Sequence, residues 1–153
     1  MSDGDRESNQ IRIVIPGVPV ARKAHRKVKL ANGKSAISRN EKDASFQNLV
    51  MLHAGRAMAG RAPFDEPVFV EYMFIFPAPQ SLRKRERERI AAGELLVYAP
   101  ERHDGDNLMK EIGDALNNIV FTDDHLITDW AGRKRIGAKP CTILTITPLS
   151  QTT

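Results

Sequence analysis

The chain has 153 residues, a hydrophobic content of 41% and a formal net charge of +4 at pH 7. This length suits one domain with a sizeable core, and no apolar run reaches the roughly 20 residues that a transmembrane helix needs. The first residues are acidic and polar, unlike a secretory signal, and the single Cys141 excludes an internal disulfide. We therefore expect a protein of the reducing cytoplasm that has no membrane partner.

The first third of the chain predicts a tail, a strand and a basic hairpin. Residues 1–10 contain almost no apolar side chains, so we expect a disordered tail ahead of one domain at 11–150. Alternating isoleucines over 11–15 predict a strand. Strand-like runs at 26–30 and 34–38 flank an Asn-Gly pair, which is typical of a β-hairpin turn. This hairpin suits a flap that lies along a DNA backbone, although a mobile surface loop fits the pattern equally well.

A helix and a buried strand are predicted next. The capping-box pattern Ser38-x-x-Glu41 precedes a helical apolar face that ends at Gly60. Residues 68–76 are apolar at nearly every position, which favours a central strand covered by helices on at least one face.

A strongly charged helix is predicted over 82–92. Ser81 suits its N-cap, and Gly93 suits its C-terminal end. Because its Arg-Lys-Arg-Glu-Arg-Glu-Arg sequence offers almost no apolar face, it is either a solvated helix with ion pairs or an arm that contacts phosphates.

The most informative stretch begins with two aspartates and continues into an amphipathic helix. Asn107, or Asp106 before it, suits the helix N-cap, because a side-chain oxygen there accepts a backbone N–H. The apolar residues that follow have helical spacing and share one face: Leu108, Ile112, Ala115, Leu116 and Ile119.

Acidic residues and a lysine avoid that apolar face. Asp106, Lys110 and Asp114 are spaced by four, so each lies about one turn, roughly 6 Å, from the next. Asp123 and Asp124 follow in a polar turn, and folding this turn back beside the helix start would bring carboxylates together. Two carboxylates about 4 Å apart repel by roughly 4 kcal/mol at an effective dielectric of 20, and a cation between them relieves the repulsion. Ligands that offer only oxygen favour Mg²⁺, with Mn²⁺ as a substitute.

Each part of this motif also has a purely structural interpretation. Asp106 can be only a cap, the spaced charges only a solvated ion-pair ladder, and Asp123-Asp124 only a turn. All three together favour a site, because a cap, a ladder and a turn do not require one another. Leu108 and Met109 stand where an EF-hand needs Asp or Asn and then Gly, and the four histidines lack zinc-ligand spacing.

The end of the chain predicts two strands, over 125–130 and 141–147, with Gly132 and a basic run between them. Trp130, the only tryptophan, is expected to pack in the core rather than stack on DNA. With a further short strand over 95–98, the order of elements predicts an α+β domain with a mixed β-sheet packed by helices.

Three basic runs surround the acidic centre, an arrangement that suits a polyanion whose phosphates must reach a metal. Any single run is explained equally well as a solvated face. From two of these runs and the approach to the acidic motif we predict the DNA-binding residues Arg22, Lys23, Arg26, Lys27, Arg102, Arg133, Lys134 and Arg135.

The acidic motif resembles the RusA family of Holliday-junction resolvases. It reads Asp104-x-Asp106-Asn107-Leu108-x-Lys110-x3-Asp114-Ala115-Leu116-Asn117, then Asp123-Asp124 and an isoleucine-containing strand. The resemblance implies a RusA-like fold in a small homodimer. It also implies a Mg²⁺-dependent endodeoxyribonuclease, without a small-molecule cofactor, that nicks four-way junctions symmetrically in DNA recombination and repair.

The resemblance also implies roles for individual residues. It places the catalytic acids, which are also the metal ligands, at Asp104, Asp106 and Asp124, and the essential lysine at Lys110. Two further acids are candidates to orient the lysine or a water molecule: Asp114 and Asp123.

Two positions depart from the family pattern, which usually has proline at 103 and often glycine at 118. Here His103 and Asn118 occupy them. Two rival functions also fit the residues: a non-catalytic DNA-binding protein with a structural cation, and a metal nuclease for other branched or duplex DNA.

Overall fold

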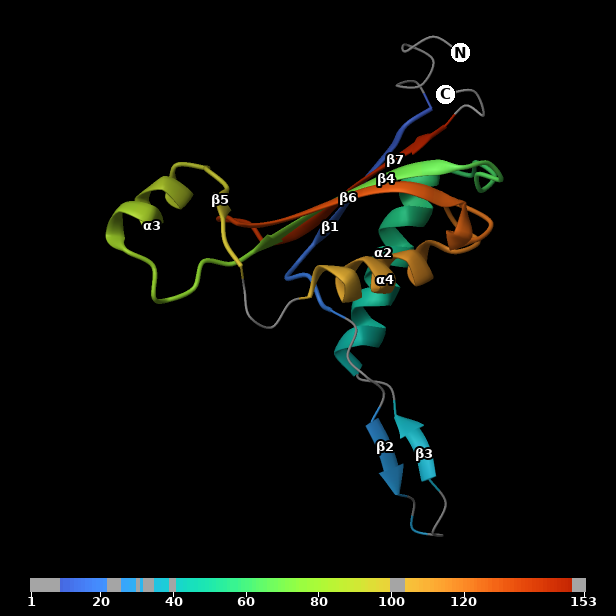
Figure 1. Cartoon of the computed structure of the whole chain (residues 1–153), viewed down its shortest axis with the longest axis horizontal. Helices are drawn as coiled ribbons and strands as arrows, with labels where there is room; N and C mark the ends of the chain where they lie inside the picture. The colour runs from blue at the N-terminus through green and yellow to red at the C-terminus, as the bar shows by residue number, and fades with distance from the viewer. Residues whose placement is uncertain are drawn as a thin grey trace.

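The computed structural model describes residues 9–21, 26–29, 31, 35–38, 41–99 and 104–149, with backbone only for 26–29, 35–38 and 41–43. Its centre is a five-stranded mixed sheet (Figure 1). Helices α2 (Glu41–Met58) and α4 (Gly105–Leu116) lie together on one face of this sheet. This arrangement confirms the predicted α+β class and the mixed sheet in a single domain.

The sheet has the strand order β1-β7-β4-β6-β5. Only β4 and β6 run parallel, and every other neighbouring pair is antiparallel. The strands are β1 (Ile11–Pro16), β4 (Val68–Phe76), β5 (Leu96–Val97), β6 (Ile127–Ile136) and β7 (Cys141–Pro148). The predicted central strand 68–76 is confirmed as β4, which lies between β7 and β6.

The core forms between the sheet and the two helices because alternate strand residues point toward the helices. Ile11, Ile13 and Ile15 of β1 are buried, whereas the residues between them are exposed. Leu144 and Ile146 of β7 are fully buried on the same side. Burying each such side chain contributes about 1.5–3 kcal/mol to folding, so the sheet is held firmly where it faces α2 and α4.

The predicted basic hairpin is present as β2 (Arg26–Lys29) paired antiparallel with β3 (Ser35–Ser38). Figure 1 shows it extending away from the sheet, below α2. Its expected Asn-Gly turn lies outside the described residues. Helix α2 follows and ends at Met58, because Ala59 and Gly60 both have a positive φ, +49° and +82°; the end lies close to the predicted Gly60.

Helix α3 (Lys84–Ala91) begins later than predicted, and its N-cap is Arg83 rather than Ser81. The residues before it form a turn, in which the Leu82 N–H donates to the Pro79 carbonyl over 3.3 Å. The Arg87 guanidinium also donates to the carbonyls of Gln80 and Leu82, which holds these residues outside the helix. The end of the helix agrees with the prediction, since Gly93 has a φ of +96°.

Strand β6 runs through Gly132 and the basic run, where the prediction ended it at Trp130. Parallel pairing with β4 continues to Phe76, so the backbone of β6 stays extended despite the glycine and the charges. The prediction that Trp130 packs in the core is wrong, because its side chain is 61% exposed. The short strand expected over 95–98 is present as β5, but it covers only the last two residues of β6. In the described part of the chain, no helix is long and apolar enough to cross a bilayer.

Candidate active site along helix α4

The N-terminus of α4 is capped by Asp104, not by Asn107 or Asp106 as predicted. The Asp104 carboxylate accepts the backbone N–H of Asp106 at 3.0 Å, and its carbonyl accepts the Leu108 N–H at 3.0 Å. Gly105 therefore belongs to the helix, which the sequence pattern did not show because glycine is a weak helix former. One residue thus both starts the helix and supplies a predicted metal ligand.

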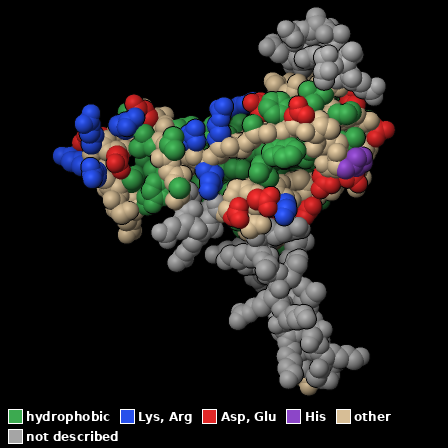
Figure 2. Space-filling model, viewed as in Figure 1, with side chains coloured by type: hydrophobic (Ala, Val, Ile, Leu, Met, Phe, Trp, Pro, Cys, Tyr) green, Lys and Arg blue, Asp and Glu red, His purple; other side chains and the backbone are tan. Residues whose placement is uncertain are grey.

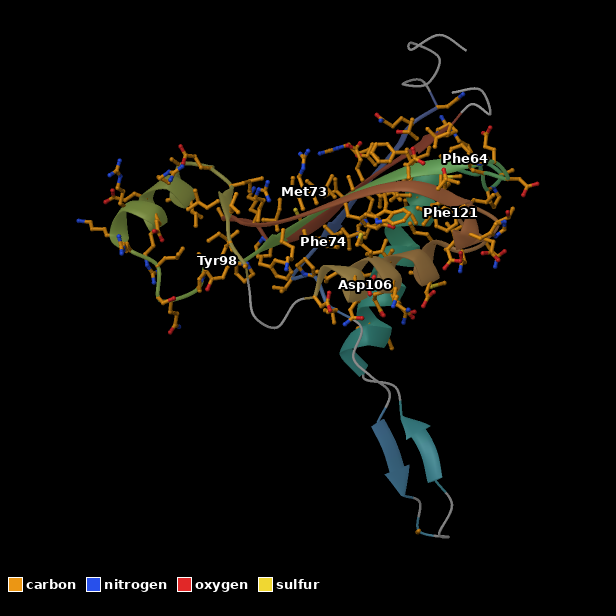
Figure 3. The ribbon with its side chains drawn as sticks, in the orientation of Figure 1. Phe64, Met73, Phe74, Tyr98, Asp106 and Phe121 are labelled. Carbon is orange, nitrogen blue, oxygen red and sulfur yellow. The ribbon has the colours of Figure 1, made fainter. Side chains whose placement is uncertain are left out.

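The exposed side of α4 carries the predicted row of charges. Lys110 Nζ lies 3.3 Å from Asp106 Oδ2, and both side chains are about two-thirds exposed, at 60% and 68%. Such an exposed pair one turn apart contributes only about 0.3–0.5 kcal/mol. Figure 3 shows Asp106 at the first turn of α4, on the side away from the sheet. The pair is therefore accessible and easily rearranged.

The segment after α4 is hydrogen-bonded to Phe64, which precedes β4. The Phe64 N–H donates to the Val120 carbonyl over 2.8 Å, and the Thr122 N–H donates to the Phe64 carbonyl over 3.0 Å. Phe121 between them is fully buried (Figure 3). Asn118 has a φ of +65°, which asparagine tolerates better than most residues. The chain can therefore turn back along α4.

That return places Asp123 and Asp124 at a short 3-10 helix, η1 (Asp124–Leu126). Asp123 caps η1, because its Oδ1 accepts the backbone N–H of His125 at 3.0 Å and lies 3.0 Å from His125 Nδ1. The backbone and side chain of His125, followed by the Asp124 side chain, lower the pKa of Asp123 to about 2 through hydrogen bonds. Asp123 is therefore an ionised capping residue.

Asp124 lies against the polar side of α4, beside Gly113. A Cβ atom added to Gly113 would lie 3.9 Å from Asp124 Cβ and 4.0 Å from its Oδ2. Partial burial raises the pKa of Asp124, as do its hydrogen bond to Asp123 and the charges of Asp123 and Asp114. Its negative charge in turn adds to the effect of burial in raising the pKa of the Tyr72 phenol beneath it. A cation near Asp124 would relieve this unfavourable concentration of negative charge.

The predicted acids lie in two groups at opposite ends of one helix face. Asp104 and Asp106 are at its start with Lys110, whereas Asp124 lies beside Gly113, whose position is two turns or about 10 Å from that of Asp106. Among the described residues, no three His, Cys, Asp or Glu side chains stand close enough to share a metal ion. The donors are all carboxylate oxygens, which chemically suit Mg²⁺ or Mn²⁺.

Gly113 offers a test of the space beside Asp124. Gly113→Ala should raise the free energy of unfolding by about 0.5–1 kcal/mol, because alanine is the better helix former and its Cβ meets no atom closer than 3.9 Å. The added methyl group should also cover part of the Asp124 carboxylate and make it less accessible to a divalent ion. Urea denaturation with and without Mg²⁺ measures both effects. A variant that is more stable than the parent and gains as much stability from Mg²⁺ would show that no ion binds at Asp124.

Two of the predicted DNA-binding residues whose side chains the structure describes, Arg133 and Lys134, lie on opposite faces of the sheet. Arg22, Lys23 and Arg102 lie outside the described residues, and Arg26 and Lys27 are in β2 with only their backbone described. On β6, Arg133 pairs with Met73 and borders a shallow pocket on the helix-free face of the sheet. Lys134 pairs with the buried Phe74 and therefore belongs to the opposite, helix-covered face.

Basic side chains also gather over α3, at the end of the molecule away from the acids (Figure 2). Arg89 pairs with Glu94 at 2.5 Å, and Arg87 is engaged by backbone carbonyls. The three cations at the start of the helix have no ion-pair partner in the described part of the chain: Arg83, Lys84 and Arg85. Because cations in a first helical turn oppose the helix dipole, helix stability does not explain them.

Glu111 is a buried acidic residue that the prediction overlooked. Its side chain is 1% exposed, on the flank of α4 that belongs to the core. Its spacing of three from Leu108 and four from Ala115 already places it beside the apolar face, so periodicity could have revealed it.

Comparison with known proteins agrees with the acidic motif. Residues 16–147 match the family described as endodeoxyribonuclease RusA. The chain is also 26% identical over 130 residues to the uncharacterized protein YqaN of Bacillus subtilis (strain 168), an alignment that covers 85% of this chain and 90% of the relative. The matched region contains β4, α4, η1 and every predicted catalytic residue. The chain therefore belongs to the RusA family of endodeoxyribonucleases.

Proposed function

We propose that this protein is a Mg²⁺-dependent, structure-specific endodeoxyribonuclease that resolves Holliday junctions by paired symmetric nicks. The main support is that Asp106, Lys110 and Asp124 lie along one face of α4. The chain also belongs to the RusA family. We further propose that it works in the cytoplasm, in DNA recombination and repair.

Asp104 and Asp106 would hold a divalent ion at the start of α4, and Asp124 would hold one beside Gly113, about 10 Å along the same face. When bound, such an ion would act as a Lewis acid that polarises the scissile phosphate and makes water a better nucleophile. Asp106 is 68% exposed and only weakly paired, so its carboxylate can turn away from Lys110 at little cost. One oxygen of Asp104 accepts the helix N–H, which fixes the direction of the carboxylate. Asp114 and Asp123 would orient Lys110 and Asp124 rather than touch DNA.

Lys110 would neutralise the charge that develops on the scissile phosphate. Its ammonium group is 60% exposed and tethered one turn from Asp106, which keeps it beside the acids and open to DNA. Lys110→Ala should lower cleavage by at least about 100-fold, the typical effect of losing one charge-stabilising group, and change stability by less than about 0.5 kcal/mol. Single-turnover cleavage with thermal unfolding measures both. If the variant cleaves at the parent rate, Lys110 has no role in the reaction.

A four-way junction has nearly two-fold symmetry and two strands to cut. One acidic centre per chain therefore favours a homodimer with two-fold symmetry. The basic residues of the β2–β3 hairpin, β6 and α3 would contact phosphates on the junction arms. Because phosphate contacts weaken with salt, junction affinity should fall steeply as ionic strength rises.

Cleavage of matched synthetic substrates tests the proposal. Purified protein with Mg²⁺ should nick a four-way junction at two symmetry-related positions, and should act far more slowly on a fork or linear duplex of the same sequence. Equal rates on all three substrates would favour a general metal nuclease. Junction binding without Mg²⁺-dependent nicking would favour a DNA-binding protein whose cation is structural.

A further inference from the structure

Strand β6 leaves one of its edges open where the sheet ends. Its inner side pairs with β4, whereas β5 pairs only with Arg135 and Ile136 on its outer side. Among the described strands, none pairs with the outer side of β6 before Arg135. The pairing with β4 is irregular around Thr128, so Asp129–Lys134 is the regular part of this open edge. Unpaired backbone groups of this kind readily add another strand.

The side chains of this open edge alternate between the two faces of the sheet. Asp129, Ala131 and Arg133 pair with Phe69, Glu71 and Met73, on the helix-free face. Trp130 and Gly132 pair with the buried Val70 and Tyr72, on the face that α4 covers. Neither Asp129 nor Arg133 has an ion-pair partner in the described part of the chain. Within Asp129–Arg133 the edge therefore offers one acid, one base, one exposed indole and one glycine.

We propose that Asp129–Arg133 pairs antiparallel with the same segment of a second copy of this chain, around a two-fold axis at Ala131. In this register Asp129 lies opposite Arg133 of the second copy, and the same pair repeats on the other side of the axis. Trp130 lies opposite Gly132 of the second copy, again twice. Ala131 lies opposite itself, and its small side chain allows the two strands to approach.

The alternating faces restrict the registers that a two-fold axis allows. Residues directly opposite each other in an antiparallel pair have their side chains on the same face. A symmetric pairing must therefore be centred on a residue, and the nearest alternatives are centred on Trp130 or Gly132. Centring on Trp130 places two bulky indoles face to face, and centring on Gly132 places Trp130 opposite Lys134. Only the register centred on Ala131 pairs Asp129 with Arg133.

The same register gives the exposed indole an apolar site. A Cβ atom on Gly132 would lie 3.3 Å from Met109 Sδ of α4, so the face of Gly132 is bordered by a thioether. An indole laid across a glycine covers backbone that no side chain protects, and sulfur is a favourable neighbour for an aromatic ring. Trp130 of one copy would thus contact Gly132 and Met109 of the other.

The opposite edge of the sheet lacks this self-complementarity. Strand β1 forms that edge, and Arg12 is its only charged residue. Two copies of β1 would therefore bring no opposite charges together, and Pro16 lacks a backbone N–H to share. The charge pattern selects β6 as the surface for a second copy.

Cysteine substitution reads this register directly. The inference deepens the proposed homodimer, so the parent protein should first be shown to be a dimer by sedimentation equilibrium. With Cys141→Ser removing the only native cysteine, Ala131→Cys should form a disulfide-linked dimer under mild oxidation, because opposite residues have Cα atoms about 4.5–5.5 Å apart. Asp129→Cys and Arg133→Cys should each stay uncrosslinked alone and crosslink when mixed.

The matched controls are Trp130→Cys and Gly132→Cys, which should not crosslink with themselves. A dimer in which either control crosslinks in preference to Ala131→Cys would overturn the register. A dimer in which no position of this segment crosslinks would overturn the surface. Neither result would contradict the proposed nuclease activity, because that activity is assayed separately on the uncrosslinked parent protein.

Charge reversal gives an independent measurement. Asp129→Arg and Arg133→Asp should each weaken dimerisation by roughly tenfold, because each places like charges together twice, and the double variant should return near the parent affinity. The single tryptophan adds a readout, since its emission should shift to the red when dilution separates the dimer. Emission that responds to added DNA but not to dilution would instead make Trp130 a base-stacking residue and contradict the inference.

Discussion

Replacing Asp104 with asparagine is expected to abolish Mg²⁺-dependent cleavage and leave the protein as stable as the parent. Asparagine caps a helix about as well as aspartate, so the 3.0 Å hydrogen bond from the Asp106 N–H has an acceptor in the variant. The neutral amide, however, is a poor ligand for a hard divalent ion. Junction affinity measured without divalent ions should also be unchanged, because no basic residue is altered.

Asp104→Ala is the control that separates the two roles of this residue. Alanine removes both the cap and the ligand, so it should lose cleavage and also about 1 kcal/mol of stability. Urea denaturation of the parent and the two variants gives the comparison. If the asparagine variant unfolds as easily as the alanine variant, Asp104 is a structural residue whose charge the helix needs. If the asparagine variant cleaves normally, Asp104 is not a metal ligand.

Asp124→Asn should abolish cleavage and make the protein more stable at neutral pH. A carboxyl group whose pKa is raised on folding favours the folded state only below its ordinary pKa, and this contribution is lost as the pH rises through the raised value. At neutral pH, which is above the ordinary aspartate pKa, Asp124 therefore opposes folding, and a neutral amide does not. The gain over the parent should shrink as the pH is lowered past the ordinary aspartate pKa. Denaturation at several pH values without divalent ions measures it.

Asp123→Asn is the matched control, with the opposite sign. The pKa of Asp123 is lowered to about 2, so its ionised form favours folding above its ordinary pKa, and that contribution disappears as the pH falls toward 2. This variant should be less stable than the parent at neutral pH. Added Mg²⁺ should stabilise the parent more than the Asp124→Asn variant, because a ligand stabilises a protein only where it binds and the variant has lost the carboxylate beside Gly113. Equal stabilisation of both would show that no ion binds at Asp124.

Helices and strands that are determined by the spacing of nearby residues could be predicted from the sequence. The apolar spacing from Leu108 to Leu116 gave α4, and the acids and lysine on its other side follow from the same period. The alternating β1 and the apolar β4 were predicted within a residue, because each pattern reflects burial by one layer of helices. The acidic motif was specific enough to indicate the family, which comparison with known proteins confirmed.

The exposure and position of residues that contact distant segments of the chain could not be predicted from the sequence. Trp130 is exposed on the part of β6 that β5 does not reach, and nothing near Trp130 in the sequence encodes the length of β5. The late start of α3 depends on Arg87 binding carbonyls of the preceding turn, which competes with the capping signal of Ser81. The place of Asp124 beside Gly113 depends on how the 117–124 segment is fastened to Phe64. These features require tertiary contacts.

The pairing of β1 with β7 has a consequence for how the protein folds. Ile11 lies opposite Ile146, so the two strands that meet come from nearly opposite ends of the sequence (Figure 1). A nascent chain cannot complete its sheet until β7 has left the ribosome, and β1 has no partner among the described strands until then. Closing so large a loop is slow, since its entropy must be lost before the contacts form.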